Sequence, residues 1–195
     1  MAAKATCVCC TLFISLFFVS PFVILITLAL LNANPKFYIQ ELYIPSLNTS
    51  NSLTHNLSNP NTSIIIDLKF KREVASDPLH YENINITLSY GPNRTSVGSS
   101  VVAGFSQGKK KKTARRRAVV DARGLPWEEA FERVSGGSGV EVGVEVATGY
   151  VLRRCDEHNC YYTKTKAVVV AADLVVDGSG VEVSKKPTRL KNVLV

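Results

Sequence analysis

The chain has 195 residues and a formal net charge of +7, and 46% of its residues are hydrophobic. This length accommodates one ordinary domain with its own core beside a membrane segment. The excess of Lys and Arg favours acidic partners such as wall polysaccharide, lipid head groups or acidic proteins.

The first predicted element is an apolar run at the N-terminus, where residues 5–35 carry no charge. Residues 12–31 would form a helix of about 30 Å, roughly the hydrocarbon thickness of a bilayer. Pro21 removes one backbone hydrogen bond near the middle, which a membrane helix tolerates. The alternative is a cleaved signal peptide, but the run is longer than an ordinary signal-peptide core. We therefore expect a cytosolic N-terminus over residues 1–10 and a transmembrane signal anchor over residues 11–33.

Two features place the domain that follows, residues 34–195, on the extracellular side. The first is a cluster of five Asn-x-Ser/Thr sequons, which are glycosylation acceptors on secreted surfaces, although a region rich in Asn, Ser and Thr also produces some by chance. The second is the close pair Cys155 and Cys160, because an even number of cysteines suits an oxidising compartment. The sequons are Asn48, Asn56, Asn61, Asn85 and Asn93.

Three further cysteines, Cys7, Cys9 and Cys10, lie at the cytosolic edge of the predicted helix. Juxtamembrane cysteines are candidates for S-palmitoylation. The alternative is apolar filler at the helix start, because a free cysteine packs as a small hydrophobic residue. We expect no zinc site there, because no fourth ligand is nearby.

The extracellular region contains several short strands separated by turns and polar loops. Residues 84–90 show the pattern most clearly, with Ile84, Ile86 and Leu88 on one face and polar side chains on the other. One short helix is predicted at residues 125–134, with Pro126 in its first position. Many strands with little helix indicate an all-β fold, an antiparallel β-sandwich. The predicted strands are residues 36–44, 64–70, 84–90, 97–105, 140–151, 161–176 and 181–183, with a loop at 46–61 and a turn at 177–180.

The pair Cys155 and Cys160 lies at the facing ends of two long predicted strands, with a four-residue loop between them. A disulfide across the end of a hairpin is geometrically plausible, and it would constrain the unfolded chain only modestly. The alternative is a metal site that also uses His158. Such a site lacks a fourth ligand, and extracellular thiols are usually oxidised, so we expect no metal.

The densest run of charge lies at residues 109–117, where seven of nine side chains are basic. In a soluble protein such a run indicates nuclear localisation or nucleic-acid binding. The membrane segment argues against both, and no aromatic residues interleave the run to stack bases, so we expect no nucleic-acid partner. The alternatives are a solvated loop or a contact with anionic wall polymer or a partner protein. The basic residues are Lys109, Lys110, Lys111, Lys112, Arg115, Arg116 and Arg117.

Several stretches resemble the plant non-race-specific disease resistance/harpin-induced-like family. NPKFYIQ at residues 34–40 and YIPSL at 43–47 look like the segment that follows the membrane helix of that family. Asn-Pro-Asn at 59–61 and FSQGKK at 105–110 are similar to two further motifs. The Val-Glu-Val, Asp-Gly-x-Gly-Val and Lys-Lys pattern over 140–186 is similar too, so the resemblance spans nearly the whole chain.

The resemblance implies an extracellular late embryogenesis abundant group 2 domain with a β-sandwich similar to fibronectin type III. It also implies a plasma-membrane location, a role in plant defence, signalling or membrane–cell wall adhesion, and no catalytic residues or cofactor. Immune-signalling proteins and anionic wall polysaccharide would be the partners. The chain departs from the family after Asn61, where the aromatic pair is missing, and its last residues are too short and too basic for a glycolipid-anchor signal.

Two other functions compete with this one. A domain that protects against desiccation stress is compatible with the late-embryogenesis resemblance. A membrane-anchored hydrolase would need a nucleophile, a base and a group that orients the base. The histidines His55, His80 and His158 lie in polar, loop-like surroundings, and no Gly-x-Ser-x-Gly, His-Glu-x-x-His or phosphate-loop motif is present. We therefore expect a non-enzymatic protein.

Overall fold

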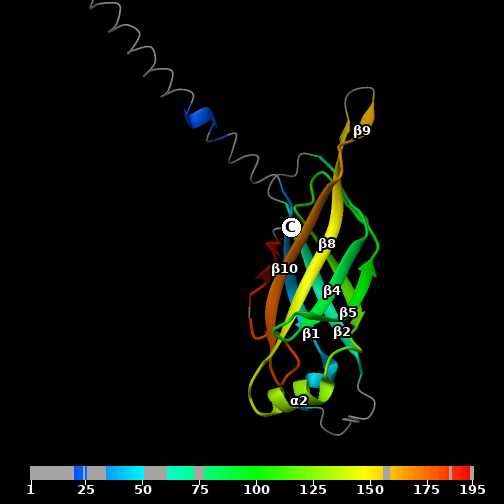
Figure 1. The fold of residues 1–195 in the computed structure, drawn as a ribbon. Helices are drawn as coiled ribbons and strands as arrows, with labels where there is room; N and C mark the ends of the chain where they lie inside the picture. The colour runs from blue at the N-terminus through cyan, green and yellow to red at the C-terminus, as the bar shows by residue number, and fades with distance from the viewer. Residues whose placement is uncertain are drawn as a thin grey trace, which may run out of the picture.

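The structure is a computed structural model that describes residues 20–23, 25, 34–50, 61–72, 77–155, 159–184 and 186–193. Antiparallel strands make up most of the domain, which confirms the all-β prediction. Figure 1 shows an elongated domain with a short helix at one end and a small hairpin strand at the other. The strands are β1 (Lys36–Tyr43), β2 (Ser63–Lys71), β3 (Leu79–Tyr81), β4 (Ile84–Tyr90), β5 (Thr95–Val102), β6 (Phe105–Gln107), β7 (Thr113–Asp121), β8 (Val140–Cys155), β9 (Cys160–Tyr162), β10 (Lys166–Val176), β11 (Thr188–Arg189) and β12 (Lys191–Asn192), and the helices are η1 (Pro45–Leu47) and α2 (Trp127–Ser135).

The strands are hydrogen-bonded in the order β11-β1-β2-β7-β5-β4-β8-β10-β12, and β3, β6 and β9 branch from this path. The longest ladder joins β8 to β10 from Val140↔Val176 to Tyr150↔Lys166. β7 joins β5 only through Ser99↔Asp121, so β1, β2 and β7 form one wing and β5, β4, β8 and β10 form another. Both wings contribute buried side chains to one continuous hydrophobic core.

The alternation of side chains explains why these segments form strands. In β4, Ile84, Ile86 and Leu88 are buried and Asn85 is exposed, as the sequence predicts. In β8, the valines at 140, 142, 144 and 146 are buried, and the glutamates between them face solvent. A period of two places every second side chain in the core, and the burial of apolar side chains stabilises the sheet.

The helix α2 closes the end of the domain that lies opposite β9 (Figure 1). It begins at Trp127, and Pro126 is its N-cap residue rather than its first helical residue. Ala130 and Val134 are its buried residues. The turn after β10 packs nearby, where the N–H of Ile44 donates to the carbonyl of Gly180 at 2.7 Å. Gly180 has a φ of +75°, and a side chain there would collide with that segment.

Four strands lie outside the predicted set. β7 covers residues 113–121, so Arg115, Arg116 and Arg117 belong to a strand and not to a solvated loop. The inward face of β7 consists mainly of small residues and is interrupted by Arg116. For this reason the sequence does not show a clear alternation of apolar and polar side chains. β3 has three residues, and β11 and β12 have two each, which is too short for a periodic pattern. The predicted strand at 97–105 is divided between β5 and β6.

Most of the predicted transmembrane segment, residues 11–33, lies outside the described residues. Residues 20–23 and 25 are helical and exposed. Within the described part of the chain, no helix has both the length and the apolar character needed to cross a membrane.

Candidate functional site

The structure divides the basic run into three groups. Lys109, Lys110, Lys111 and Lys112 lie in the exposed loop between β6 and β7. Arg115 and Arg117 are exposed on the outer face of β7, whereas Arg116 points to the opposite face and is half-buried. The alternation of a strand therefore separates side chains that are adjacent in sequence.

Arg116 lies against the ring of Phe105, with its guanidinium carbon 3.9 Å from the ring centroid. Such a cation–π contact contributes about 0.5–1 kcal/mol at exposed sites. Phe105 in turn stacks on Tyr81, with ring centroids 4.8 Å apart. Arg116 thus covers one edge of the aromatic core, which gives it a packing role that Arg115 and Arg117 lack.

Buried polar side chains fix the position of the basic loop. The carboxamide nitrogen of Gln107 donates to the carbonyl of Lys111 at 2.8 Å, and the carboxamide oxygen accepts from the hydroxyl of Tyr81 at 3.3 Å. The backbone N–H of Arg72 donates to the carbonyl of Lys112 at 2.8 Å. Gln107 is 1% exposed and Arg72 is 4% exposed, so both side chains are shielded from water. The backbone of the loop is therefore tied to the domain at Lys111 and Lys112.

Burial also changes the protonation equilibria of these groups. Desolvation lowers the pKa of Arg72, and this effect is opposed by the nearby Tyr81 and Asp77. Desolvation raises the pKa of Tyr81, so its hydroxyl stays protonated and continues to donate to Gln107. The guanidinium of Arg72 donates to the carbonyls of Asp77 and Gln107. A charge that is buried in this way requires such partners.

The register of the sheet collects further cations beside Arg115. Lys69 on β2 lies directly opposite Arg115 on β7. On its other side Lys69 lies opposite Tyr38 on β1, and Tyr38 lies opposite Arg189 on β11. With strands about 4.8 Å apart, these four residues form a line of roughly 14 Å across the outer face. We call Arg189, Tyr38, Lys69 and Arg115 the cationic row.

Like charges directly opposite one another destabilise a sheet. Neither Lys69 nor Arg115 forms an ion pair with a carboxylate in the described part of the chain. Lys71 extends the positive surface towards the loop, where it lies opposite Lys36. On the other side the surface ends at Glu41, Asp67 and Arg117, which form the next row across the same strands. The cationic row thus has an unfavourable arrangement of charge that folding does not require.

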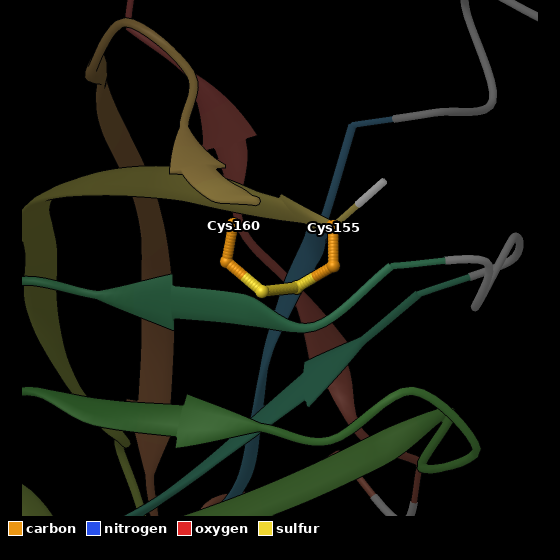
Figure 2. Close-up of a disulfide and its surroundings, with 2 residues drawn as sticks. All are labelled: Cys155 and Cys160. Atoms are coloured by element: carbon orange, nitrogen blue, oxygen red, sulfur yellow. A yellow bond between two sulfur atoms is a disulfide. The ribbon is translucent and has the colours of Figure 1, made fainter. Parts of the chain in front are cut away.

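Cys155 and Cys160 are joined by a disulfide (Figure 2), with Cα atoms 4.0 Å apart. The two residues lie opposite each other in the ladder between β8 and β9. The disulfide therefore closes the hairpin at its tip, as the spacing predicts. His158, the third residue of the alternative metal site, lies outside the described residues. In the described part of the chain, no three metal-binding side chains cluster.

The sequons differ in their surroundings. Asn61, Asn85 and Asn93 are exposed. Asn48 is half-buried, and its side chain donates to the hydroxyl of Tyr43 and accepts from the N–H of Ser50. Three of the predicted acceptor residues thus present their side chains to solvent. Asn56 and the three N-terminal cysteines Cys7, Cys9 and Cys10 lie outside the described residues.

Other predicted residues lie apart from the basic surface or have no catalytic setting. The ring nitrogen Nδ1 of His80 lies 3.0 Å from the hydroxyl of Ser106 on the exposed face of β3 and β6. His55 and His158 lie outside the described residues. Sequence reasoning missed Arg72 and Gln107, because arginine and glutamine are usually exposed. Gln107 does belong to the FSQGKK motif, which was the one available signal.

Comparison with known proteins adds little to this geometry. No family model and no curated protein matches the chain. A solved structure of a protein from Archaeoglobus fulgidus is similar in part, with 9% sequence identity and a TM-score of 0.34. The match covers 61% of this chain and 90% of the other.

Proposed function

We propose that this chain is a non-catalytic, single-pass protein of the plant plasma membrane that attaches to anionic polysaccharide of the cell wall. The cationic row is the observation that carries the proposal. Its charges lie at successive strands of one sheet face, and Tyr38 lies between Arg189 and Lys69. A linear polyuronate offers carboxylates at intervals and sugar rings that pack on an aromatic side chain.

The fixed loop beside the row supports the same function. Lys109 to Lys112 are held on a backbone that is hydrogen-bonded to buried Gln107 and Arg72. Binding to a fixed set of charges costs less conformational entropy than binding to a disordered run. Exposed charges contribute little to stability, so their concentration here favours a role in binding.

The resemblance to the harpin-induced-like family supports the remaining parts of the proposal. These parts are the membrane anchor at residues 11–33, the extracellular domain and a role in plant defence. They also include a β-sandwich similar to fibronectin type III, in which the β1-β2-β7 wing would pack on the β5-β4-β8-β10 wing. The shared hydrophobic core of the two wings is compatible with that arrangement.

The proposal can be tested by retention of the detergent-solubilised full chain on immobilised polygalacturonate. A variant with Lys110, Lys111, Arg115 and Arg117 replaced by Gln should elute at lower salt, and it should unfold at the same temperature or slightly higher. Arg116 is retained because it packs on Phe105. The control replaces Arg123 and Arg133, which are exposed near the other end of the domain. Equal salt profiles for both variants and the wild type would contradict the proposal.

A further inference from the structure

The polypeptide enters the domain at the same end as the basic loop. Asn34 precedes β1, and its side-chain oxygen accepts from the hydroxyl of Tyr150 at 3.0 Å. Lys36 is the first residue of β1 and lies opposite Lys71, the last residue of β2. The next residue, Arg72, donates its backbone N–H to the carbonyl of Lys112 in the basic loop. The described part of the domain therefore begins at this end, at Asn34.

The hairpin of β8 and β9 projects from this end (Figure 1). It pairs Arg153 with Tyr162 and Arg154 with Tyr161. Tyr161 is 47% exposed and Tyr162 is 60% exposed, although tyrosine side chains in soluble domains are usually at least partly buried. The disulfide between Cys155 and Cys160 holds the two strands of the hairpin together (Figure 2).

The two ends of the domain differ in charge. The end with β9 carries the exposed basic side chains of the loop and of the hairpin, together with Lys164 and Lys166. Its described carboxylates are Asp77, which lies 3.7 Å from Arg154, and Glu82, which accepts from Thr165. The α2 end instead carries several exposed carboxylates, partly offset by Arg123 and Arg133. They are Asp121, Glu128, Glu129, Glu132 and Asp177.

We propose that the basic end of the domain rests on the phosphate groups of the phospholipid head groups, with Tyr161 and Tyr162 at the same level of the membrane. Tyrosine and tryptophan favour the membrane–water interface, where a ring meets the apolar boundary and its polar end stays in water. Arginine and lysine side chains donate charge-assisted hydrogen bonds to phosphate oxygens, which every phospholipid head group carries. For its orientation, this inference rests on the membrane anchor of the proposed function.

The hairpin separates this contact from the wall-polymer contact. Arg153, Arg154, Tyr161 and Tyr162 lie on β8 and β9, whereas the cationic row lies on β1, β2, β7 and β11. A polymer laid along the cationic row has no need of the hairpin. A bilayer at the end of the domain meets the hairpin, because the hairpin projects furthest there (Figure 1).

The single tryptophan of the chain allows a direct test, because Trp127 begins α2 at the opposite end. β8 alone has 16 residues, which corresponds to roughly 50 Å at about 3.3 Å per residue. The full chain is reconstituted into vesicles that carry a nitroxide on the lipid head group, which quenches an indole only at short range. Two proteins are compared: the wild type and a variant with Trp127→Phe and Tyr162→Trp.

In vesicles that contain phosphatidylserine, the indole introduced by Tyr162→Trp should lose most of its fluorescence. Trp127 of the wild type should lose little. Added salt should restore the fluorescence of the introduced indole, and so should the additional changes Arg153→Gln and Arg154→Gln. The matched changes Arg123→Gln and Arg133→Gln should not restore it. No quenching of the introduced indole, or equal quenching at both ends, would overturn the inference.

Flotation and polymer retention distinguish failure of this inference from failure of the proposed function. Loss of flotation with phosphatidylcholine vesicles would contradict the anchor. Binding to phosphatidylserine vesicles would then still test the basic end, since loss of that binding in the Arg153 and Arg154 variant supports the inference and unchanged binding overturns it. Retention on polygalacturonate should be unchanged in this variant, and a loss there would assign the hairpin to the polymer instead.

Discussion

At the end where β1 begins, the core consists of packed aromatic rings around buried polar side chains, whereas its fully buried side chains at the α2 end are aliphatic. Phe70 lies 5.3 Å from Phe37 and 5.1 Å from Phe105 between ring centroids, beside buried Gln107. Near α2, the fully buried side chains, such as Val140, are aliphatic, and the aromatic side chains of Trp127 and Phe131 are only partly buried. The aromatic end also carries the basic loop, so the aromatic and polar core side chains lie beside the charges whose backbone they hold in place. The α2 end needs only to exclude water.

The largest expected effect is on the aromatic end of the core. Phe70→Ala should lower the free energy of unfolding by about 3–5 kcal/mol, because the ring is buried and its cavity cannot collapse. The matched change at the other end, Val140→Ala, should cost roughly 2 kcal/mol because it removes fewer buried methyl groups. Urea unfolding of the detergent-solubilised chain, followed by circular dichroism, measures both. An equal cost would contradict the comparison.

A smaller effect is expected for the polar part of that core. Gln107→Ala should cost about 1–3 kcal/mol, because the hydroxyl of Tyr81 and the carbonyl of Lys111 lose their partner. Amide exchange at residues 108–112 should also become faster. Ser106→Ala is the control, because its side chain is exposed one residue away. If the loop amides exchange at the same rate in both variants, Gln107 does not fix the loop.

Two adjacent arginines sharpen the distinction between support and binding. Arg115→Gln should raise the free energy of unfolding by up to about 1 kcal/mol, since it relieves repulsion from Lys69, and should weaken retention on polygalacturonate. Arg116→Gln should lower it by about 0.5–1 kcal/mol through loss of the contact with Phe105, and should leave retention unchanged. The same effect of both changes on retention would show that the strand does not separate the two roles.

The smallest effect concerns the turn after β10 at the α2 end. Hydrogen bonds from Ser179 lower the pKa of Asp177, so the ionised carboxylate stabilises the fold. This contribution is present above the unfolded pKa of about 4 and is lost as the pH falls through the lower folded value. The melting temperatures of the wild type and Asp177→Asn should therefore differ at pH 7 and converge in acid.

Glu182 provides a contrast of opposite sign. Desolvation raises its pKa, and a hydrogen bond from Thr188 opposes this shift. Its burial therefore destabilises the fold at neutral pH, and this cost declines as the pH falls below the raised folded pKa and is gone below the unfolded pKa. Glu182→Gln should gain melting temperature relative to the wild type as the pH rises, whereas Asp177→Asn should lose it. The same trend in both variants would show that the assigned environments are wrong.

The sequence predicts the parts of this fold in which side-chain polarity follows the backbone. β4 has the predicted bounds because its buried and exposed residues alternate without interruption. The sequence of β7 resembles a simple run of charge, because Arg116 occupies an inward position and the other inward positions are partly alanine. The opposition of Lys69 and Arg115 could not be predicted, because register depends on strand order and not on either segment alone. The buried Arg72 gives no local signal at all.

The C-terminal strands have a consequence for the solution behaviour of the chain. β11 pairs with β1, and β12 pairs with β10. These two short strands, which are adjacent in sequence, are therefore the two ends of the hydrogen-bonded strand order. Between them Leu190 is buried, and its N–H donates to the carbonyl of Phe37. Open edges of long strands are templates for pairing between molecules. The segment 188–192 therefore covers the edges of β1 and β10 and hinders edge-to-edge aggregation. Its removal is expected to make the domain self-associate.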